Sequence, residues 1–262
     1  MQRLTFPAVF IMKFIRNHII RKKMKSLKIL LIFSICLGIS SCTNAQIRKT
    51  VRGDGDVVKK DRTTTPFDGI RVSSGIDVYL KQGDNESITV EADENLHEYI
   101  LTKVKDGILN VFTDANIREA KMERVHVTIK DVKSLKTSSA GDIIGESPIK
   151  GTDIEIGASS AGDIRLEVYA KRIEVNISSS GDISLSGEAE TLNADLSSAG
   201  DLDAYNFKVK EADVSASSAG DAKINVSEKI KARASSAGDI YYQGDPKYVD
   251  AHSSSAGGIH KR

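Results

Sequence analysis

The sequence predicts an all-β fold, namely a right-handed parallel β-helix (a solenoid) with coils of about 19 residues and an irregular β-rich cap at its N-terminal side. Three observations predict it. The pentapeptide Ser-Ser-Ala-Gly-Asp recurs, its copies are almost evenly spaced, and apolar residues alternate with polar ones in the same phase in every copy. Periods of 20–50 residues are typical of stacked repeats, and a period of two within each repeat is typical of strands.

The repeat sets the length of one coil. Successive motif glycines are 21, 19, 19, 20, 18 and 19 residues apart, which leaves room for two or three short strands at about 3.3 Å per residue. Stacked coils then lie about 4.8 Å apart, and the strong preference of parallel crossover connections predicts a right-handed path. The intact copies span residues 138–142, 159–163, 197–201, 217–221 and 235–239, and variant copies span 178–182 and 254–258.

Residues 66–131 are expected to form the less regular N-terminal part, and residues 132–262 the regular coils. Residues 67–80 alternate around Ser73-Ser74-Gly75, which echoes the later motif. A strand is expected at 87–92, a short helix at 95–101, and a hairpin that turns at Lys105-Asp106-Gly107. We expect this part to cover the first coil, whose exposed strand edge would otherwise pair with other chains.

The first 41 residues have the pattern of a signal peptide. They contain eight Lys/Arg and no Asp or Glu, and a basic segment precedes an apolar run at 29–39 that is too short to span a bilayer. Met24 stands where such a peptide would ordinarily begin, so it is a candidate for the true start. The run ends in Ile39-Ser40-Ser41-Cys42, which resembles a lipobox and predicts lipidation of Cys42. The alternative is ordinary cleavage beside an unmodified cysteine.

The predicted mature chain is acidic. Without the leader it has 29 Lys/Arg against 36 Asp/Glu, a net charge of about −7, which makes nucleic acid an improbable partner. Residues 42–65 are polar and rich in Thr and Lys, so we expect a tether between lipid and domain. Thr43 follows Cys42, and an acidic run is lacking there. This is compatible with outer-membrane sorting but leaves periplasmic and surface exposure open.

Stacking the motif brings its aspartates into one file about 4.8 Å apart. Adjacent carboxylates repel by about 1 kcal/mol in bulk water and by more where water is scarce, so something must offset the repulsion. One alternative is that each carboxylate accepts hydrogen bonds from backbone N–H groups at a corner where glycine supplies a backbone conformation that other residues resist. The other is that pairs of carboxylates hold Ca²⁺, which takes several oxygen ligands. The file consists of Asp142, Asp163, Asp182, Asp201, Asp221 and Asp239.

The second serine of each motif shares the phase of the apolar columns. Buried hydroxyl groups must be hydrogen bonded, so we expect an internal ladder of serines, unless the alternation breaks at the corner and turns them outward. No serine has a His or Lys partner in its own repeat, which argues against a nucleophile. These serines are Ser139, Ser160, Ser179, Ser198, Ser218, Ser236 and Ser255.

Several sequence blocks, in their order, resemble those of the head GIN domain family of auto-transporter adhesins, which are common as exported lipoproteins of Bacteroidetes-type bacteria. The resemblance covers about residues 52–258 and implies a right-handed β-helix-like fold and an adhesin-like role. The blocks are Phe67 to Val72, Gly75 to Leu80, Gln82 to Asp84, Val90 to Leu96 and Gly107 to Leu109, followed by the serine-rich coils.

The sequence therefore predicts a non-catalytic lipoprotein of the cell envelope, anchored in the outer membrane, that binds glycan or protein and carries no cofactor unless the aspartate file holds Ca²⁺. A structural periplasmic protein without an external ligand is a second hypothesis. A β-helix polysaccharide lyase or hydrolase is a third. Against it stand the short coils, the lack of Trp, and histidines without ligand-like spacing, namely His97, His126, His252 and His260.

Overall fold

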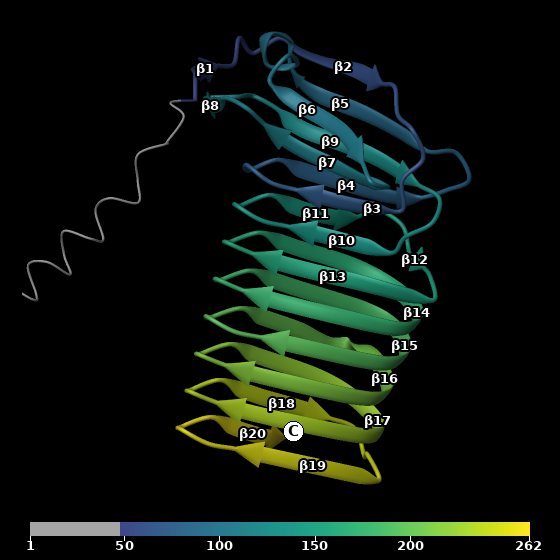
Figure 1. The fold of residues 1–262 in the computed structure, drawn as a ribbon, viewed down its shortest axis with the longest axis vertical. Helices are drawn as coiled ribbons and strands as arrows, with labels where there is room; N and C mark the ends of the chain where they lie inside the picture. Colours follow the sequence, from purple (N-terminus) through teal and green to yellow (C-terminus); the bar gives the residue numbers. More distant parts are fainter. Residues whose placement is uncertain (1–47) are drawn as a thin grey trace, which may run out of the picture. The chain divides into compact units, whose positions relative to one another are not determined.

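A computed structural model describes residues 48–262 and shows a stack of flattened parallel coils beneath a β-rich cap (Figure 1). The predicted all-β solenoid is confirmed. The predicted signal peptide and the lipidation site at Cys42 lie outside the described residues and stay predictions. Within residues 48–262, no helix has the length and apolar character needed to cross a membrane.

Four long strands form the middle of the stack. Each pairs in parallel with the next, and the register aligns the serine motifs of neighbouring coils. Asp163 thus lies opposite Asp182, and Asp182 lies opposite Asp201. Each strand bends once, at the edge opposite the serine motif. The strands are β14 (Asp163–Ser178), β15 (Asp182–Leu196), β16 (Asp201–Ser217) and β17 (Asp221–Ser235).

Shorter strands continue the stack on both sides. In Figure 1, segments that lead into the serine corner run leftward in front and those that leave it run rightward behind, while the chain descends, which is the right-handed sense. The strands before β14 are β10 (Ser134–Thr137), β11 (Asp142–Gly145), β12 (Ile149–Lys150) and β13 (Asp153–Ser159). Those after β17 are β18 (Asp239–Gln243), β19 (Tyr248–Ser253) and β20 (Gly258–Lys261).

The first coils do not stack in chain order. Strands β3 (Gly69–Val72) and β4 (Asp77–Gln82) lie between a coil made by β7 (Ile108–Thr113) and β9 (Glu123–Ile129) and the coil made by β10 and β11. Thus Ile70 pairs with Leu109 on one side and with Leu135 on the other. The motif-like Ser73-Ser74-Gly75 therefore forms the first corner of the regular stack.

Antiparallel strands cover the other side of the β7 and β9 coil. Strand β5 (Ser87–Asp93) lies between β2 (Val57–Arg62) and β9, and the hairpin predicted at residues 105–107 joins β6 (Ile100–Lys105) to β7. A separate two-stranded sheet pairs β1 (Thr50–Arg52) with β8 (Asn116–Arg118). The predicted β-rich cap is confirmed, but two details are wrong. Residues 50–52 and 57–62 of the expected tether form β1 and β2, and the expected helix is one 3₁₀ turn, η1 (Glu94–Leu96).

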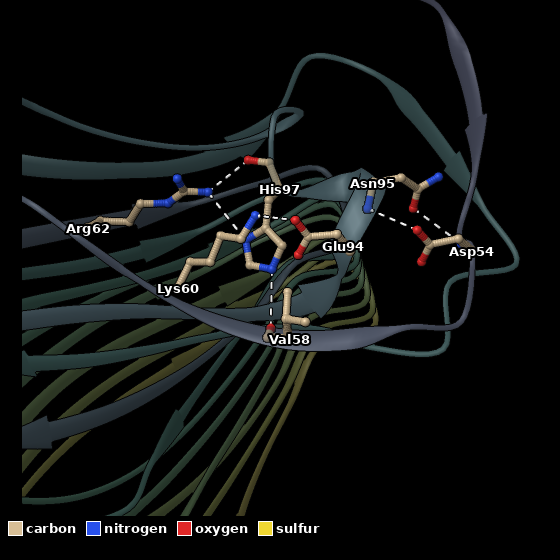
Figure 2. Close-up of polar contacts among 7 residues, drawn as sticks. All are labelled: Asp54, Val58, Lys60, Arg62, Glu94, Asn95 and His97. Carbon is tan, nitrogen blue, oxygen red and sulfur yellow. Dashed lines mark hydrogen bonds and ion pairs between the residues drawn. The ribbon is translucent and has the colours of Figure 1, made fainter.

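Polar contacts fasten β2 to η1 (Figure 2). Lys60 pairs with Glu94 at 2.7 Å, and the Arg62 guanidinium donates a 2.8 Å hydrogen bond to the His97 carbonyl. The His97 ring is buried against the Val58 carbonyl, 3.2 Å from its Nε2. Burial lowers the pKa of His97, because the surroundings disfavour the charged imidazolium. The buried site of His97 in the cap therefore favours the neutral imidazole.

A single apolar core runs through cap and coils. Inward positions before and after each corner carry Ile, Val, Leu or Ala, as the alternation predicts, and most of them are fully buried. The column Ile154, Ile173, Leu192, Ala212 and Ile230 is an example. Because one coil cannot bury its own apolar side chains, each coil depends on its neighbours.

Candidate functional site

The serine corner is built from two consecutive residues with positive φ. They are the second serine and the residue after it, for example Ser160 (φ 52°) and Ala161 (φ 60°), and seven corners from Ser139 to Ala256 repeat the arrangement. The N–H of Ala140 donates to the Ser160 carbonyl at 3.0 Å, and the N–H of Ala161 donates to Ser179 at 3.1 Å. Neighbouring corners are therefore joined by backbone hydrogen bonds along the stack.

The motif glycine has a steric role and no positive φ, so the expectation that it supplies the unusual conformation is wrong. A Cβ on Gly181 would lie 2.7 Å from the carbonyl carbon of Ala158 and 2.8 Å from its oxygen. The glycine packs directly on the backbone of the neighbouring coil, where no side chain fits. Its N–H also closes the turn by donating to the Ser178 carbonyl at 3.2 Å.

The second serines point outward, so the predicted internal ladder is wrong. All seven, from Ser139 to Ser255, are exposed. The two positive-φ residues break the strand alternation, which is the second of the two outcomes that the sequence left open. The first serine of every motif but the last is half-buried, as Ser159 and Ser178 are, whereas Ser254 is exposed.

The aspartates do form one file, and the file begins one coil earlier than predicted. Asp142 lies opposite Asp77, and at the other end Asp239 lies opposite Gly258. Asp77 was missed because its motif, Ser73-Ser74-Gly75-Ile76-Asp77, lacks the usual glycine position. The echo of the corner was its only signal.

Backbone donors offset part of the repulsion in this file. The Asp142 carboxylate accepts the N–H of Asp163 at 3.1 Å, Asp201 accepts that of Asp221 at 3.3 Å, and Asp221 accepts that of Asp239 at 3.2 Å. This is the first of the two predicted arrangements. Asp142, Asp201 and Asp221 thereby help to set the register of the next coil.

Burial nevertheless raises the pKa of three file members, Asp77, Asp142 and Asp182, and the charges of neighbouring aspartates add to the effect. Arg165, 3.2 Å from Asp163, relieves some of the repulsion. The alternative that the file holds Ca²⁺ stays a prediction. In the part of the chain that the structure describes, no group of three or more His, Cys, Asp or Glu side chains has the arrangement of a metal site.

The outer surface beside the corner is hollowed into a groove. We call the outward side of the segments before the serine corner the leading face, and that of the segments after it the trailing face. The groove on the leading face has a volume of about 520 Å³ and crosses several coils. Side chains that line it include Lys136, Glu155, Asn176, Asp195, Ser159, Ser178, Ser197, Ser215 and Ser217, together with Gly157.

Short side chains create this hollow. Gly157 and Ser215 lie in the same outward file as Asn176 and Asp195, with Lys136 next to Gly157 in the register and Arg233 next to Ser215. A Lys136–Glu155 ion pair of 2.6 Å borders one end. The groove thus presents amide, hydroxyl and carboxylate groups between two basic residues.

The described histidines are dispersed. His97 is buried in the cap, His126 contacts Glu91 at 3.0 Å, His252 contacts Asp250 at 2.8 Å, and the His260 ring stacks on Tyr241. His97 follows η1 in the cap, and the other three lie on β9, β19 and β20. Within residues 48–262, no histidine ring forms a hydrogen bond with a motif serine.

Comparison with known proteins identifies the family. The model of the family described as "Putative auto-transporter adhesin, head GIN domain" matches residues 66–246, well over half of the chain. The chain belongs to this family. The resemblance noted in the sequence is therefore confirmed.

Solved structures share the fold. A "putative adhesin" from Bacteroides fragilis has a TM-score of 0.76 at 20% identity, covering 81% of this chain and 100% of that one. A "putative adhesin" from Parabacteroides merdae has a TM-score of 0.67 at 24% identity, with 82% and 99% covered. A "putative lipid binding protein" from Parabacteroides distasonis has a TM-score of 0.66 at 21% identity, with 82% and 100% covered.

These descriptions refer to adhesion or binding, and none of them names a catalytic activity. At these identities the solved structures establish the fold alone. A search of curated proteins finds no match.

Proposed function

We propose that this head GIN domain protein is a non-catalytic lipoprotein of the cell envelope that binds a glycan or protein ligand along the groove of its leading face. The observation that carries the proposal is the groove itself, which crosses several coils and is lined by polar groups. Regular stacking places these groups at intervals of about 4.8 Å. Such a row suits an extended polar ligand.

The chemistry of the groove supports recognition by hydrogen bonds. The amide of Asn176 and the hydroxyls of Ser215 and Ser217 supply donors and acceptors, while Asp195 and Lys136 add one charge of each sign. Solenoids commonly use such extended surfaces for binding. A lipid on Cys42 would hold this surface at a membrane, since several acyl chains anchor stably where a single chain holds only marginally.

Two assays on the mature chain carrying Cys42→Ser, which removes the lipid, test the binding role. The chain is applied to an array of host and bacterial glycans and, on beads, to detergent-solubilised envelope proteins. We expect a specific ligand whose binding is weakened by Gly157→Gln, which places a side chain in the groove. A Cβ at Gly157 meets no atom closer than 3.5 Å, so this variant should fold normally.

Ser184→Gln is the matched control, because Ser184 is an exposed position on the trailing face. If no ligand depends on the groove in either assay, the proposal fails in favour of a structural periplasmic protein. Release of reducing or unsaturated ends from acidic polysaccharides would instead favour an enzyme.

The anchor and the location need separate measurements in cells. Labelled palmitate should enter the wild-type chain and not the Cys42→Ala variant. Protease added to intact cells should digest the protein if it is displayed on the surface. Full protection would exclude an adhesin that acts outside the cell.

A further inference from the structure

A second cavity lies where the file of serine corners begins. Between β7 and β9 the chain does not form a corner over Ser73-Ser74-Gly75, but turns aside so that β8 pairs with β1. This detour leaves a cavity of about 670 Å³, which we call the corner pocket. Small-molecule sites in proteins commonly have volumes of about 300–1,000 Å³.

The corner pocket is lined mainly by small polar groups. Hydroxyls come from two adjacent corners and from the end of β7, and an amide comes from β8. Only one cation and one carboxyl group join them, Arg48 and Glu123. The hydroxyl and amide groups belong to Ser73, Ser74, Thr113, Asn116, Ser138 and Ser139.

The backbone carbonyl of Ser74, beside the corner pocket, accepts no hydrogen bond from the described residues. The carbonyl of the second serine in the next corners accepts an N–H from the corner before it, as Ser139 does from Gly75 and Ser160 from Ala140. Ser74 holds the same position at the start of the file, and no described residue donates to its carbonyl. A polar ligand in the pocket would supply the missing donor.

Most N–H groups of the Arg48 guanidinium have no acceptor among the described residues. One of its N–H groups donates to the Thr113 carbonyl at 3.3 Å, and none of the carboxylates in residues 48–262 lies within 4.0 Å of its guanidinium. The planar guanidinium is well suited to bind a carboxylate through two parallel hydrogen bonds. This makes an acidic ligand a better match than a neutral one.

Glu123 gives the pocket a dependence on pH. Burial raises the pKa of Glu123 to about 7, and the nearby charges of Asp93 and Asp77 add to the effect. Asp93 is fully buried and held by three backbone N–H groups, and Asp77 lies opposite Arg124 in the register. Below neutral pH the Glu123 carboxyl is therefore protonated and can donate a hydrogen bond to a ligand, and Arg48 is left as the charge of the pocket.

We propose that the corner pocket binds an acidic saccharide unit of the uronic acid type, with its carboxylate on Arg48 and its hydroxyls on the corner serines and Glu123. Such a unit combines the carboxylate that Arg48 lacks with donors for the Ser74 carbonyl. The site is separate from the groove of the leading face, so it extends the proposed function and does not depend on it.

Titration of the isotope-labelled mature chain carrying Cys42→Ser, followed by NMR, tests the proposal. The probes are methyl β-D-glucuronide and methyl β-D-glucoside at up to about 10 mM, where even a millimolar complex forms. At pH 6 we expect the glucuronide to shift the amide signals of residues 73–75 and 138–139, and to bind at least about tenfold more tightly than the glucoside, as expected for one charged pair worth about 1.4 kcal/mol.

Arg48→Met should abolish this preference, whereas Arg172→Met, which removes an exposed arginine on another coil, should leave it unchanged. Binding of the glucuronide should weaken from pH 6 to pH 8, and Glu123→Gln should remove that dependence. Equal binding of both probes, or no shifts with the glucuronide, overturns the proposal. Gly157→Gln should not affect these shifts, so failure here is distinguishable from failure of the groove.

Discussion

Replacing Glu123 by Gln should stabilise the protein at alkaline pH and leave it unchanged at acidic pH. In the folded state Glu123 keeps its proton up to about pH 7, because it is buried and lies near Asp93 and Asp77. In the unfolded chain the carboxyl loses its proton near the ordinary value of 4.5. The folded state thus binds the proton more tightly, so stability falls as the pH rises from 4.5 to 7. Glutamine does not titrate and removes this loss.

The size of the effect follows from the difference in pKa. A rise from 4.5 to about 7 corresponds to about 3 kcal/mol at 1.36 kcal/mol per pKa unit. Glu123 is only partly buried, and solvent screening reduces this to about 1–2 kcal/mol. For a domain of this size, that free energy corresponds to a melting temperature higher by about 2–8 °C.

Differential scanning fluorimetry of the wild type and Glu123→Gln at pH 4.5, 6, 7 and 8 measures the difference. The two melting temperatures should coincide at pH 4.5 and separate in favour of the variant above pH 7. Glu119→Gln, at an exposed carboxylate that pairs with Arg52, should show no such divergence. If the variant were less stable than the wild type at pH 8, ionised Glu123 would be stabilising, which contradicts this prediction.

Three further predictions concern the corner, the cap and the aspartate file. Gly181→Ala should cost about 2–4 kcal/mol in chemical unfolding, because its Cβ would overlap the Ala158 carbonyl, whereas Gly157→Ala should cost less than about 1 kcal/mol. Equal costs would contradict the steric role. His97→Gln should flatten the loss of stability as the pH falls below 6.5, because burial lowers the pKa of His97 and only the unfolded chain then takes up the proton. If the stabilities of the wild type and His97→Gln fell equally below pH 6.5, this role of His97 would be excluded. If the aspartate file holds cations, millimolar Ca²⁺ should raise the melting temperature. An unchanged melting temperature would exclude Ca²⁺ binding by the file.

The coils could be predicted from the sequence because their periodicity is physical. Side chains alternate in a strand, and coils of equal length stack in register, so the alternation predicts which positions point inward. Ile173, Val175 and Ile183 occupy such positions and are buried. The aspartate file followed from the same register. Its extension to Asp77 was hidden by an altered motif, and its hydrogen bonds depend on atomic geometry that spacing does not reveal.

The corner conformation could not be predicted from residue preferences. Ser160 and Ala161 adopt positive φ although their side chains disfavour it, and glycine, which tolerates it, serves the close packing instead. Because the second serines take a positive-φ conformation, the strand alternation breaks there and their side chains point outward. Tertiary pairing likewise overrode the local signal in β2, whose polar, Lys-rich sequence indicated a tether before its pairing with β5 was known. The interleaving of β3 between β7 and β10 is a long-range pairing that no local pattern shows.

If the groove of the leading face binds the ligand, a side chain that fills the groove must lower the affinity. Isothermal titration calorimetry of the ligand captured on the array or the beads should give a dissociation constant at least about tenfold larger for Gly157→Gln than for the wild type, a difference of about 1.4 kcal/mol. The constant for Ser184→Gln should equal that of the wild type. Equal constants for all three proteins would contradict the claim and move the binding surface elsewhere on the solenoid.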